Sequence, residues 1–295
     1  NGGYEHFMMK EIEEQPKAIR DTISPRIKDG KIVLDDISLT EEDIKNINKI
    51  YIVACGSAYH VGVVGKYVIE KMCRIPVEVQ VASEFRYCDP IVGKDDLVIV
   101  ISQSGETADT KAALEEAKAR GARVLSIVNV VGSAIAKASD DVIYTWAGPE
   151  IAVATTKAYS TQLTVIYLIA AYMADKLGKI SKEEYADFIK EIESLPDKVA
   201  EILKSKEDVQ YLASKFYNCH SIFFIGRNLD YAVSLEGSLK LKEISYIHSE
   251  AYAAGELKHG TISLIEDGTL VVALATGKNL FDKTVSNVKE VKARG

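Results

Sequence analysis

The 295-residue sequence has few of the residues that mark secreted, metal-binding or membrane proteins. Its four cysteines, Cys55, Cys73, Cys88 and Cys219, show neither the density of a disulfide framework nor the paired spacing of a metal site. The longest apolar stretch, around residues 163–174, is too short for a membrane span, and no secretory signal opens the chain. These absences predict a cytoplasmic protein without a bound metal, in which the cysteines are small buried apolar residues.

The chain also lacks an excess of positive charge and the glycine loops that bind nucleotides. It has 36 Lys and Arg against 43 Asp and Glu, a net charge of −7, which argues against a general nucleic-acid binder. No Walker-type loop with a lysine occurs, and no G-x-G-x-x-G follows the first predicted strand, so dinucleotides and nucleoside triphosphates are disfavoured. We expect no cofactor, no nucleic acid and no membrane partner. A local site can still bind a small anion, because it can oppose the global charge.

What the sequence does contain is an alternation of short apolar runs with helical patterns. This alternation is typical of an open parallel α/β sheet with right-handed crossovers. The predicted strands begin at residue 49 and lie at 77–82, 97–101, 123–129 and 141–146, and the predicted helices lie at 59–72, 108–120 and 156–178. We expect residues 1–48 to be a helical lead-in or linker, 49–180 a first domain, 181–215 two connecting helices and 216–295 a second domain.

The second domain repeats the first. HSIFFIGRN (220–228) resembles KIYIVACGS (49–57), LVVALATGKN (270–279) resembles LVIVISQSGE (97–106), and EVKARG (290–295) repeats EAKARG (116–121). The three matches keep the same order and nearly the same offset, which favours a true repeat over chance. In the first domain a strand follows the repeated ARG, whereas the second domain stops there. We therefore expect a truncated second sheet, with an open edge, in a piece of a longer chain.

The segment SQSGET, directly after the strand at 97–101, is the strongest candidate for a binding site. In open α/β sheets, ligands bind beyond the carboxyl ends of the strands, where the next helix offers unpaired N–H groups. The hydroxyls of Ser102, Ser104 and Thr107 and the amide of Gln103 can donate to an anion there, and Gly105 allows close backbone approach. A phosphate monoester of a small metabolite fits this neutral cradle. The alternative is that these residues merely cap the helix.

Three other serines and threonines carry weaker signals. Ser57, after the first strand, would lie beside the cradle, but a plain turn serine is an equal alternative. Thr155 and Thr156 open the long helix, and we expect them to cap it.

Charged residues in the second domain suggest chemistry. Glu236, Lys240 and Glu243 fall on one face of a predicted helix, where a solvent-facing salt-bridge ladder is the alternative reading. His259 lies in a predicted loop, and a lone histidine is more often structural than catalytic. A carboxylate and an imidazole near a sugar phosphate would suit ring opening and proton abstraction beside a carbonyl. The residues alone support a sugar-phosphate isomerase or a binding module.

Four longer motifs carry a resemblance to a known family. They are SQSGETADT (102–110), ASEFRY (82–87), TTKAYSTQLT (155–164) and LKLKEISYIHSEAYAAGELKHG (239–260). These resemble the isomerase part of glutamine–fructose-6-phosphate aminotransferase, the glucosamine-6-phosphate synthase of hexosamine biosynthesis. That part consists of two sugar isomerase (SIS) domains of the open parallel-sheet, flavodoxin- or Rossmann-like kind with flanking helices. The resemblance covers nearly the whole chain from about residue 49.

The resemblance implies an aminotransferase and ketose–aldose isomerase that makes glucosamine 6-phosphate from fructose 6-phosphate. Matching positions imply that Ser57, Ser102, Gln103, Ser104 and Thr107 bind the sugar phosphate, although Ala58 stands where the family commonly has a serine. In the catalytic part, the resemblance makes Glu243 the base that moves a proton between C1 and C2, Lys240 its helper, and His259 the ring-opening residue. That histidine reaches a neighbouring subunit's site in the family, which implies a homodimer.

The resemblance also implies parts that these residues do not contain. The family's glutaminase domain, which begins with a cysteine nucleophile, and its Schiff-base lysine, in a C-terminal tail, have no counterpart between residues 1 and 295. We therefore expect the fragment to bind the sugar phosphate but to be impaired in catalysis. A non-catalytic SIS-type sugar-phosphate sensor is the alternative function, although residues 1–48 show no basic helix-turn-helix pattern that such a sensor would need.

Overall fold

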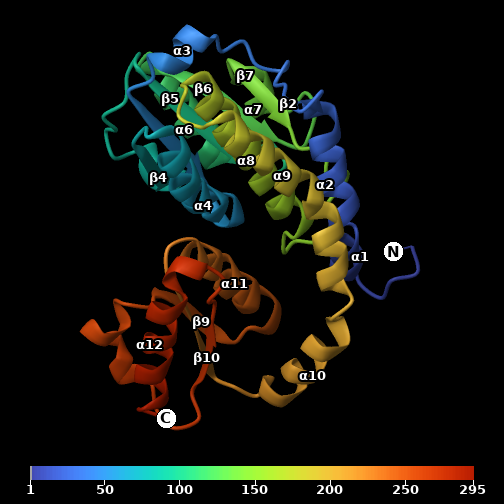
Figure 1. The fold of residues 1–295 in the computed structure, drawn as a ribbon, viewed down its shortest axis with the longest axis vertical. Coiled ribbons are helices and arrows are strands. Elements are labelled where there is room, and N and C mark those ends of the chain that lie inside the picture. Colours follow the sequence, from blue (N-terminus) through green and yellow to red (C-terminus); the bar gives the residue numbers. More distant parts are fainter. Residues whose placement is uncertain (1) are drawn as a thin grey trace. The chain divides into compact units, whose positions relative to one another are not determined.

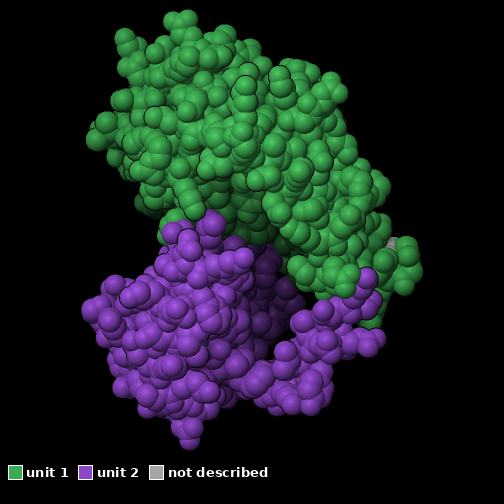
Figure 2. Space-filling view, in the orientation of Figure 1, with its two compact units in different colours: residues 1–203 green, residues 204–295 purple. Residues whose placement is uncertain are grey.

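The computed structural model describes residues 2–295 and divides into two compact units, which Figure 2 colours separately. The first unit ends at Leu203, and the second runs from Lys204 to Gly295. Each unit has an α/β fold built on its own parallel sheet. Within residues 2–295, every helix falls short of the length and apolar character that a membrane crossing requires.

The first unit is built on a five-stranded sheet with the strand order β4-β3-β5-β6-β7 (Figure 1). Its strands are β3 (Lys49–Ala54), β4 (Val77–Val81), β5 (Asp96–Ser102), β6 (Arg123–Val128) and β7 (Asp141–Tyr144). These bounds confirm the predicted strands. All neighbours are parallel, so every strand ends at the same edge of the sheet, which we call the carboxyl edge.

Helices cover both faces of this sheet, because neighbouring side chains of a strand point to opposite faces. Ile50 and Ile52 of β3 belong to one apolar core, and Tyr51 and Val53 belong to the other. The first core is completed by helices α4 (Gly56–Cys73), α8 (Lys157–Lys176) and α9 (Lys182–Leu203), and the second by α5 (Ala82–Phe85), α6 (Ala108–Ala119) and α7 (Ala134–Ala138). The three predicted helices correspond to α4, α6 and α8.

The N-terminal lead-in is part of the first unit. It consists of α1 (Phe7–Glu13), α2 (Gln15–Ile23), a 3-10 turn (Ser24–Arg26), the antiparallel pair β1 (Ile27–Lys28) and β2 (Lys31–Ile32), and α3 (Glu41–Lys45). Ile19, Ile23 and Ile44 are buried in the same core as α8. Ile189 and Ile192 of α9 join that core too, so the first unit reaches well beyond its sheet in both directions along the chain.

The second unit has a three-stranded sheet with the order β10-β8-β9. Its elements are α10 (Lys206–Phe216), β8 (Ser221–Gly226), α11 (Leu229–Ser245), β9 (His248–Ala253), three 3-10 turns (Leu257–His259, Thr261–Leu264 and Lys278–Leu280), β10 (Leu270–Ala273) and α12 (Phe281–Lys292). Phe223, Ile225 and Val291 belong to its small apolar core. The sequence did not predict β9.

The two units repeat one another, as predicted. The order β10-β8-β9 matches β5-β3-β4 of the first unit, and α11 follows β8 as α4 follows β3. Both helices end in a left-handed residue, Arg74 with φ 57° and Tyr246 with φ 62°. The strand β10 is an edge strand of the second sheet, whereas its counterpart β5 pairs with β6.

The prediction that all four cysteines are buried is wrong for Cys88, which is exposed in the loop after α5. Cys73 is buried, donates to the carbonyl oxygen of Ala170 at 3.3 Å, and has its thiol pKa raised by burial to about 12. Cys55 and Cys219 are half-buried. All four are free thiols.

Candidate functional site

The SQSGET segment folds into a hydrogen-bonded loop at the carboxyl edge, between β5 and α6. The hydroxyls of Ser102 and Thr107 lie 2.8 Å apart in a hydrogen bond, and Ser102 Oγ also accepts from the N–H of Gly105 at 3.0 Å. Ser104 Oγ accepts from the N–H of Glu106 at 3.1 Å. The structure therefore brings Ser102 and Thr107 together and places Ser104 in the same short loop.

Gly105 is required at the centre of this loop. Its φ is +67°, a left-handed conformation that side chains disfavour, and an added Cβ would lie 2.0 Å from Ser133 Oγ. The start of α7 holds the loop from the same side, since the N–H of Ile135 donates to the carbonyl oxygen of Gly105 at 2.9 Å. The N–H of Ala134 likewise donates to Glu106 Oε1 at 2.9 Å. The loop is thus fixed in shape before any ligand arrives.

Capping alone does not explain these hydroxyls. Thr107 is the N-cap residue of α6, yet its side chain makes no capping hydrogen bond. Ser102 and Thr107 share one hydrogen bond, so one of their two hydroxyl protons stays available, and Ser104 Oγ is an acceptor whose own proton has no acceptor among the described residues. Available hydroxyl protons and the free N–H groups of a helix N-terminus form a neutral anion cradle. We refer to Ser102, Ser104 and Thr107 as the cradle.

Gln103 connects the cradle to a neighbouring cavity. Its carboxamide makes no hydrogen bond among residues 2–295, and it lines a cavity of about 600 Å³. The other lining residues are Asn129, Val130, Trp146, Gly148, Pro149 and Glu150, from the ends of β6 and β7 and the following loop. Polar side chains are thus available both at the cradle and beside it.

Ser57 lies in the first turn of α4, at the same edge. Strand β3 pairs with β5, with Ala54 opposite Ile101, so the segments that follow these two strands are neighbours. Ser57 is half-buried, and Ala58 follows it in the same turn.

The prediction that Thr155 and Thr156 cap α8 is wrong. Thr156 is the N-cap residue, but its Oγ is buried without a hydrogen-bond partner. The cap is instead Glu150, whose Oε2 accepts from the N–H groups of Thr156 at 3.2 Å and Ala158 at 3.0 Å. A carboxylate complements the helix dipole better than a hydroxyl does. The hydroxyl of Thr155 also donates to Glu150.

The charged face predicted in the second unit forms on α11. Lys240 Nζ lies 3.6 Å from Glu236 Oε1 and is in direct contact with Glu243 Oε2. Glu236 is buried, whereas Glu243 is an exposed residue. This face is therefore a partly buried ion cluster rather than a fully solvated ladder, with a lysine held between two carboxylates.

The structure does not join His259 to this cluster. The histidine ends the 3-10 turn Leu257–His259, its side chain is exposed, and no hydrogen bond or ion pair among the described residues links it to Lys240 or Glu243. The cradle lies in the first unit, and Lys240, Glu243 and His259 lie in the second.

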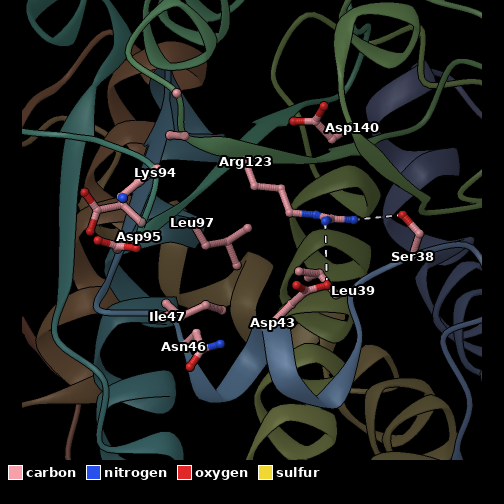
Figure 3. Close-up of a pocket in the computed structure, with 13 residues that line it drawn as sticks. Ser38, Leu39, Asp43, Asn46, Ile47, Lys94, Asp95, Leu97, Arg123 and Asp140 are labelled. Carbon is pink, nitrogen blue, oxygen red and sulfur yellow. Dashed lines mark hydrogen bonds and ion pairs between the residues drawn. The ribbon is translucent and has the colours of Figure 1, made fainter.

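A second cavity in the first unit, of about 530 Å³, lies at the opposite edge of the sheet (Figure 3). It contains Arg123, but this guanidinium is already paired: it donates to Ser38 Oγ at 2.8 Å and lies 3.7 Å from Asp43 and 2.7 Å from Asp141. Burial raises the pKa of Asp141, yet hydrogen bonds from Arg123 and Ser38 outweigh this effect, so the pKa lies below its ordinary value. The guanidinium of Arg123 is therefore engaged with residues of the protein itself.

The sequence did not predict one set of hydrogen bonds, which the second unit makes and the first does not. Asp230, in the first turn of α11, accepts from the N–H of Thr276 at 2.8 Å and from its hydroxyl at 2.5 Å. It also accepts from the N–H of Gly277 at 3.4 Å. Thr276 and Gly277 follow β10, at the place where the first unit has its cradle. No local signal marks Asp230, because its partners lie 46 and 47 residues away.

Comparisons with known proteins agree with this geometry. The family model described as SIS domain matches residues 43–172 and 215–295. A solved structure, the C-terminal domain of glucosamine-fructose-6-phosphate aminotransferase from Francisella tularensis, superposes with a TM-score of 0.96 at 40% identity. That match covers 100% of this chain and 83% of the solved one.

Two curated relatives are also similar over the whole chain. The glutamine–fructose-6-phosphate aminotransferases (isomerizing) of Caldanaerobacter subterraneus subsp. tengcongensis and Clostridium tetani are each 64% identical over 295 residues. Those residues are 100% of this chain and 48% of each relative. The chain therefore spans about half the length of the curated relatives it matches.

Proposed function

The chain belongs to the SIS domain family, matching the isomerase domain of glutamine–fructose-6-phosphate aminotransferases, and from this premise we propose that it binds fructose 6-phosphate and forms glucosamine 6-phosphate. The observation that supports this most is the cradle: linked, preorganised hydroxyls at the N-terminus of α6 with protons left to donate. A phosphate dianion is the ligand that such a neutral, donor-rich helix terminus favours. The cradle residues, Gln103 and Ser57 are the proposed phosphate ligands.

The reaction needs a proton to move between two neighbouring carbons. Ammonia condenses with the C2 carbonyl of the open sugar and releases water. One C1–H proton then passes to C2 and the C1 hydroxyl proton passes to the imine nitrogen, which leaves an aldehyde at C1 and an amine at C2 without any oxidant or reductant. We assign this transfer to the carboxylate of Glu243. Lys240, in contact with Glu243, orients that carboxylate. His259 opens the sugar ring.

The proposal has three further features. The ammonia would come from a glutaminase domain in the longer protein. A homodimer would let His259 act at the partner's sugar. The cytoplasm, where sugar phosphates and free thiols coexist, is the proposed location.

Calorimetry on the 295-residue chain tests the proposal. We expect fructose 6-phosphate and glucosamine 6-phosphate to bind at one site per chain. Fructose should bind at least about 100-fold more weakly, because the cradle contacts only the phosphate. Equal affinity for fructose and its 6-phosphate would show that the cradle does not hold the ligand.

A further inference from the structure

The N-terminal lead-in makes hydrogen bonds and an ion pair to the start, the middle and the end of the loop that joins β7 to α8, residues 145–156. At its start, the hydroxyl of Thr22 in α2 donates to the carbonyl oxygen of Thr145 at 2.5 Å. The guanidinium of Arg26 donates to the carbonyl oxygen of Tyr144 at 2.5 Å. Thr22 and Arg26 are both buried, so these bonds are shielded from water. Helix α2 and the 3-10 turn after it thereby fix the point at which the chain leaves the sheet.

Helix α1 holds the middle of the same loop through a buried carboxylate. Glu11 is only 2% exposed, and its Oε1 accepts from the N–H groups of Ile151 at 2.6 Å and Ala152 at 3.2 Å. No cation pairs with Glu11 among the described residues, so these peptide N–H groups are the main compensation for burying its charge. Breaking these hydrogen bonds would cost free energy, because it would leave a buried carboxylate or buried N–H groups without a partner.

A partly buried ion pair holds the end of the loop. Lys157, the first residue of α8, is 3% exposed. Its Nζ lies 2.7 Å from Oε2 of Glu14, the residue that joins α1 to α2. Burial raises the pKa of Glu14, but the hydrogen bond and charge of Lys157 outweigh it and bring the pKa below its ordinary value. Ser160, one turn further along α8, donates to Gln15 Oε1 at 2.5 Å.

The loop held in this way is a wall of the cavity beside the cradle. Trp146, Gly148, Pro149 and Glu150 line that cavity together with Gln103. The loop has no helix or strand of its own between β7 and α8. Its position is therefore set by the bonds that it makes to other segments.

We propose that Glu11 is a positioning residue for the sugar-phosphate site, because it holds the β7–α8 loop, whose residues 146 and 148–150 line the cavity beside the cradle together with Gln103. This inference rests on the proposed function for its link to sugar binding, but the hold on the loop does not depend on any ligand. Asn129 at the end of β6 holds the first part of this wall through Ala147 and Gly148, and Glu11 of helix α1 holds the residues directly after it, Ile151 and Ala152.

The first test follows the loop itself, by hydrogen exchange in the 295-residue chain. In Glu11→Ala the amide protons of Ile151 and Ala152 lose their acceptor, and we expect them to exchange about tenfold faster or more, with no change for Ile99 inside β5. Glu11→Gln keeps one carbonyl oxygen facing these amides and should restore most of the protection. Asp21→Ala, which removes a carboxylate from an exposed pair with Lys17, is the matched control and should match the parent.

The second test follows sugar binding in the same variants. We expect the Kd for fructose 6-phosphate to rise about tenfold in Glu11→Ala, to recover in Glu11→Gln, and to stay unchanged in Asp21→Ala. Trp146 is the only tryptophan of the sequence and lies in the loop, so its fluorescence reports both the loop and the ligand. If Glu11→Ala does not fold, Glu11→Met, which fills the space without an acceptor, replaces it.

The outcomes separate the inference from the proposed function. Unchanged exchange of Ile151 and Ala152 in a folded Glu11→Ala overturns the hold on the loop. Faster exchange with an unchanged Kd overturns the link to the site. If the parent chain itself does not bind fructose 6-phosphate, the proposed function fails, while the exchange data still decide whether Glu11 holds the loop.

Discussion

The two units build the same strand–loop–helix at corresponding places but use it in opposite ways. Val53 lies opposite Val100 in the first sheet, and Ile225 lies opposite Ala273 in the second. Counting on from these pairs, Ser102, Gln103 and Ser104 correspond to Ala275, Thr276 and Gly277, and Thr107 corresponds to Leu280. All three cradle hydroxyls are therefore absent from the second unit.

In their place the second unit has an anion of its own. Asp230 accepts from the N–H groups of Thr276 and Gly277, the groups that would otherwise face a ligand. Counting back from the left-handed ends of α4 and α11, Asp230 corresponds to Ala58 in the first unit. We propose that this methyl group in place of a carboxylate leaves the first loop open to a phosphate. The second unit instead presents the charged face of α11, so binding and proton transfer are assigned to different copies of one fold.

The largest effect is expected from Glu243→Gln, which tests whether chemistry resides in the second unit. In a protein of the relatives' full length that carries this sequence, the loss of a general base should lower turnover by about 10²–10⁴-fold, with an unchanged Kd for fructose 6-phosphate. Steady-state kinetics and calorimetry measure the two quantities. Lys242→Gln, on the same helix, is the control and should retain turnover. Undiminished turnover in Glu243→Gln would remove Glu243 from the reaction.

Ala58→Asp should convert the first loop into a copy of the second. A carboxylate there would occupy the N–H groups after β5 and repel the phosphate, by about 4 kcal/mol for like charges ~4 Å apart near a protein surface. We expect binding of fructose 6-phosphate to weaken about 100-fold or more in calorimetry. Ala58→Asn has the same size without the charge and should lose much less. Equal losses in the two variants would point to crowding rather than to occupation of the cradle.

Ser104→Ala should weaken the binding of fructose 6-phosphate by about 1–2 kcal/mol, the scale of one hydrogen bond to a charged group. Thr276→Ala, in the corresponding loop of the second unit, should leave the affinity unchanged. Calorimetry on both variants decides whether only the first loop contacts the ligand. A larger loss in Thr276→Ala than in Ser104→Ala would reverse the assignment of the two loops.

The smallest effect is expected from Asp230→Asn. The amide keeps one acceptor oxygen for Thr276 but loses the charge and one bond, so the second unit should lose about 1 kcal/mol of stability. Hydrogen exchange of the β8 and β10 amides measures this loss unit by unit. Asp282→Asn, in the first turn of α12, is the control. Unchanged protection in Asp230→Asn would mean that the carboxylate does not hold this loop.

Much of the fold could be predicted because parallel strands buried on both faces leave an uninterrupted apolar run. The runs that became β3 and β5 are of this kind, and the hydroxyls after β5 stood out because they follow such a run. Strand β9, HSEAYA, was missed because an edge strand needs no such run. Its polar residues look like a loop.

The carboxylates that bind the loops at these strand ends could not be predicted. Glu11 and Ile151 are 140 residues apart, and Asp230 and Thr276 are 46 apart, so neither pair leaves a local pattern. The threonines before α8 looked like caps, but Glu150 reached the same N–H groups with a full charge. Such contacts depend on which segments the fold brings together, and only the structure supplies that information.

We expect the first loop to bind a phosphate and the second loop, closed by Asp230, to bind none. An amide-resolved NMR titration of the chain with fructose 6-phosphate tests both expectations at once. It should give saturable shifts at the amides of Gly105, Glu106 and Thr107, with those of Thr276 and Gly277 unmoved. Saturable shifts at Thr276 and Gly277, or none at Gly105 to Thr107, would show that the two loops do not differ in this way.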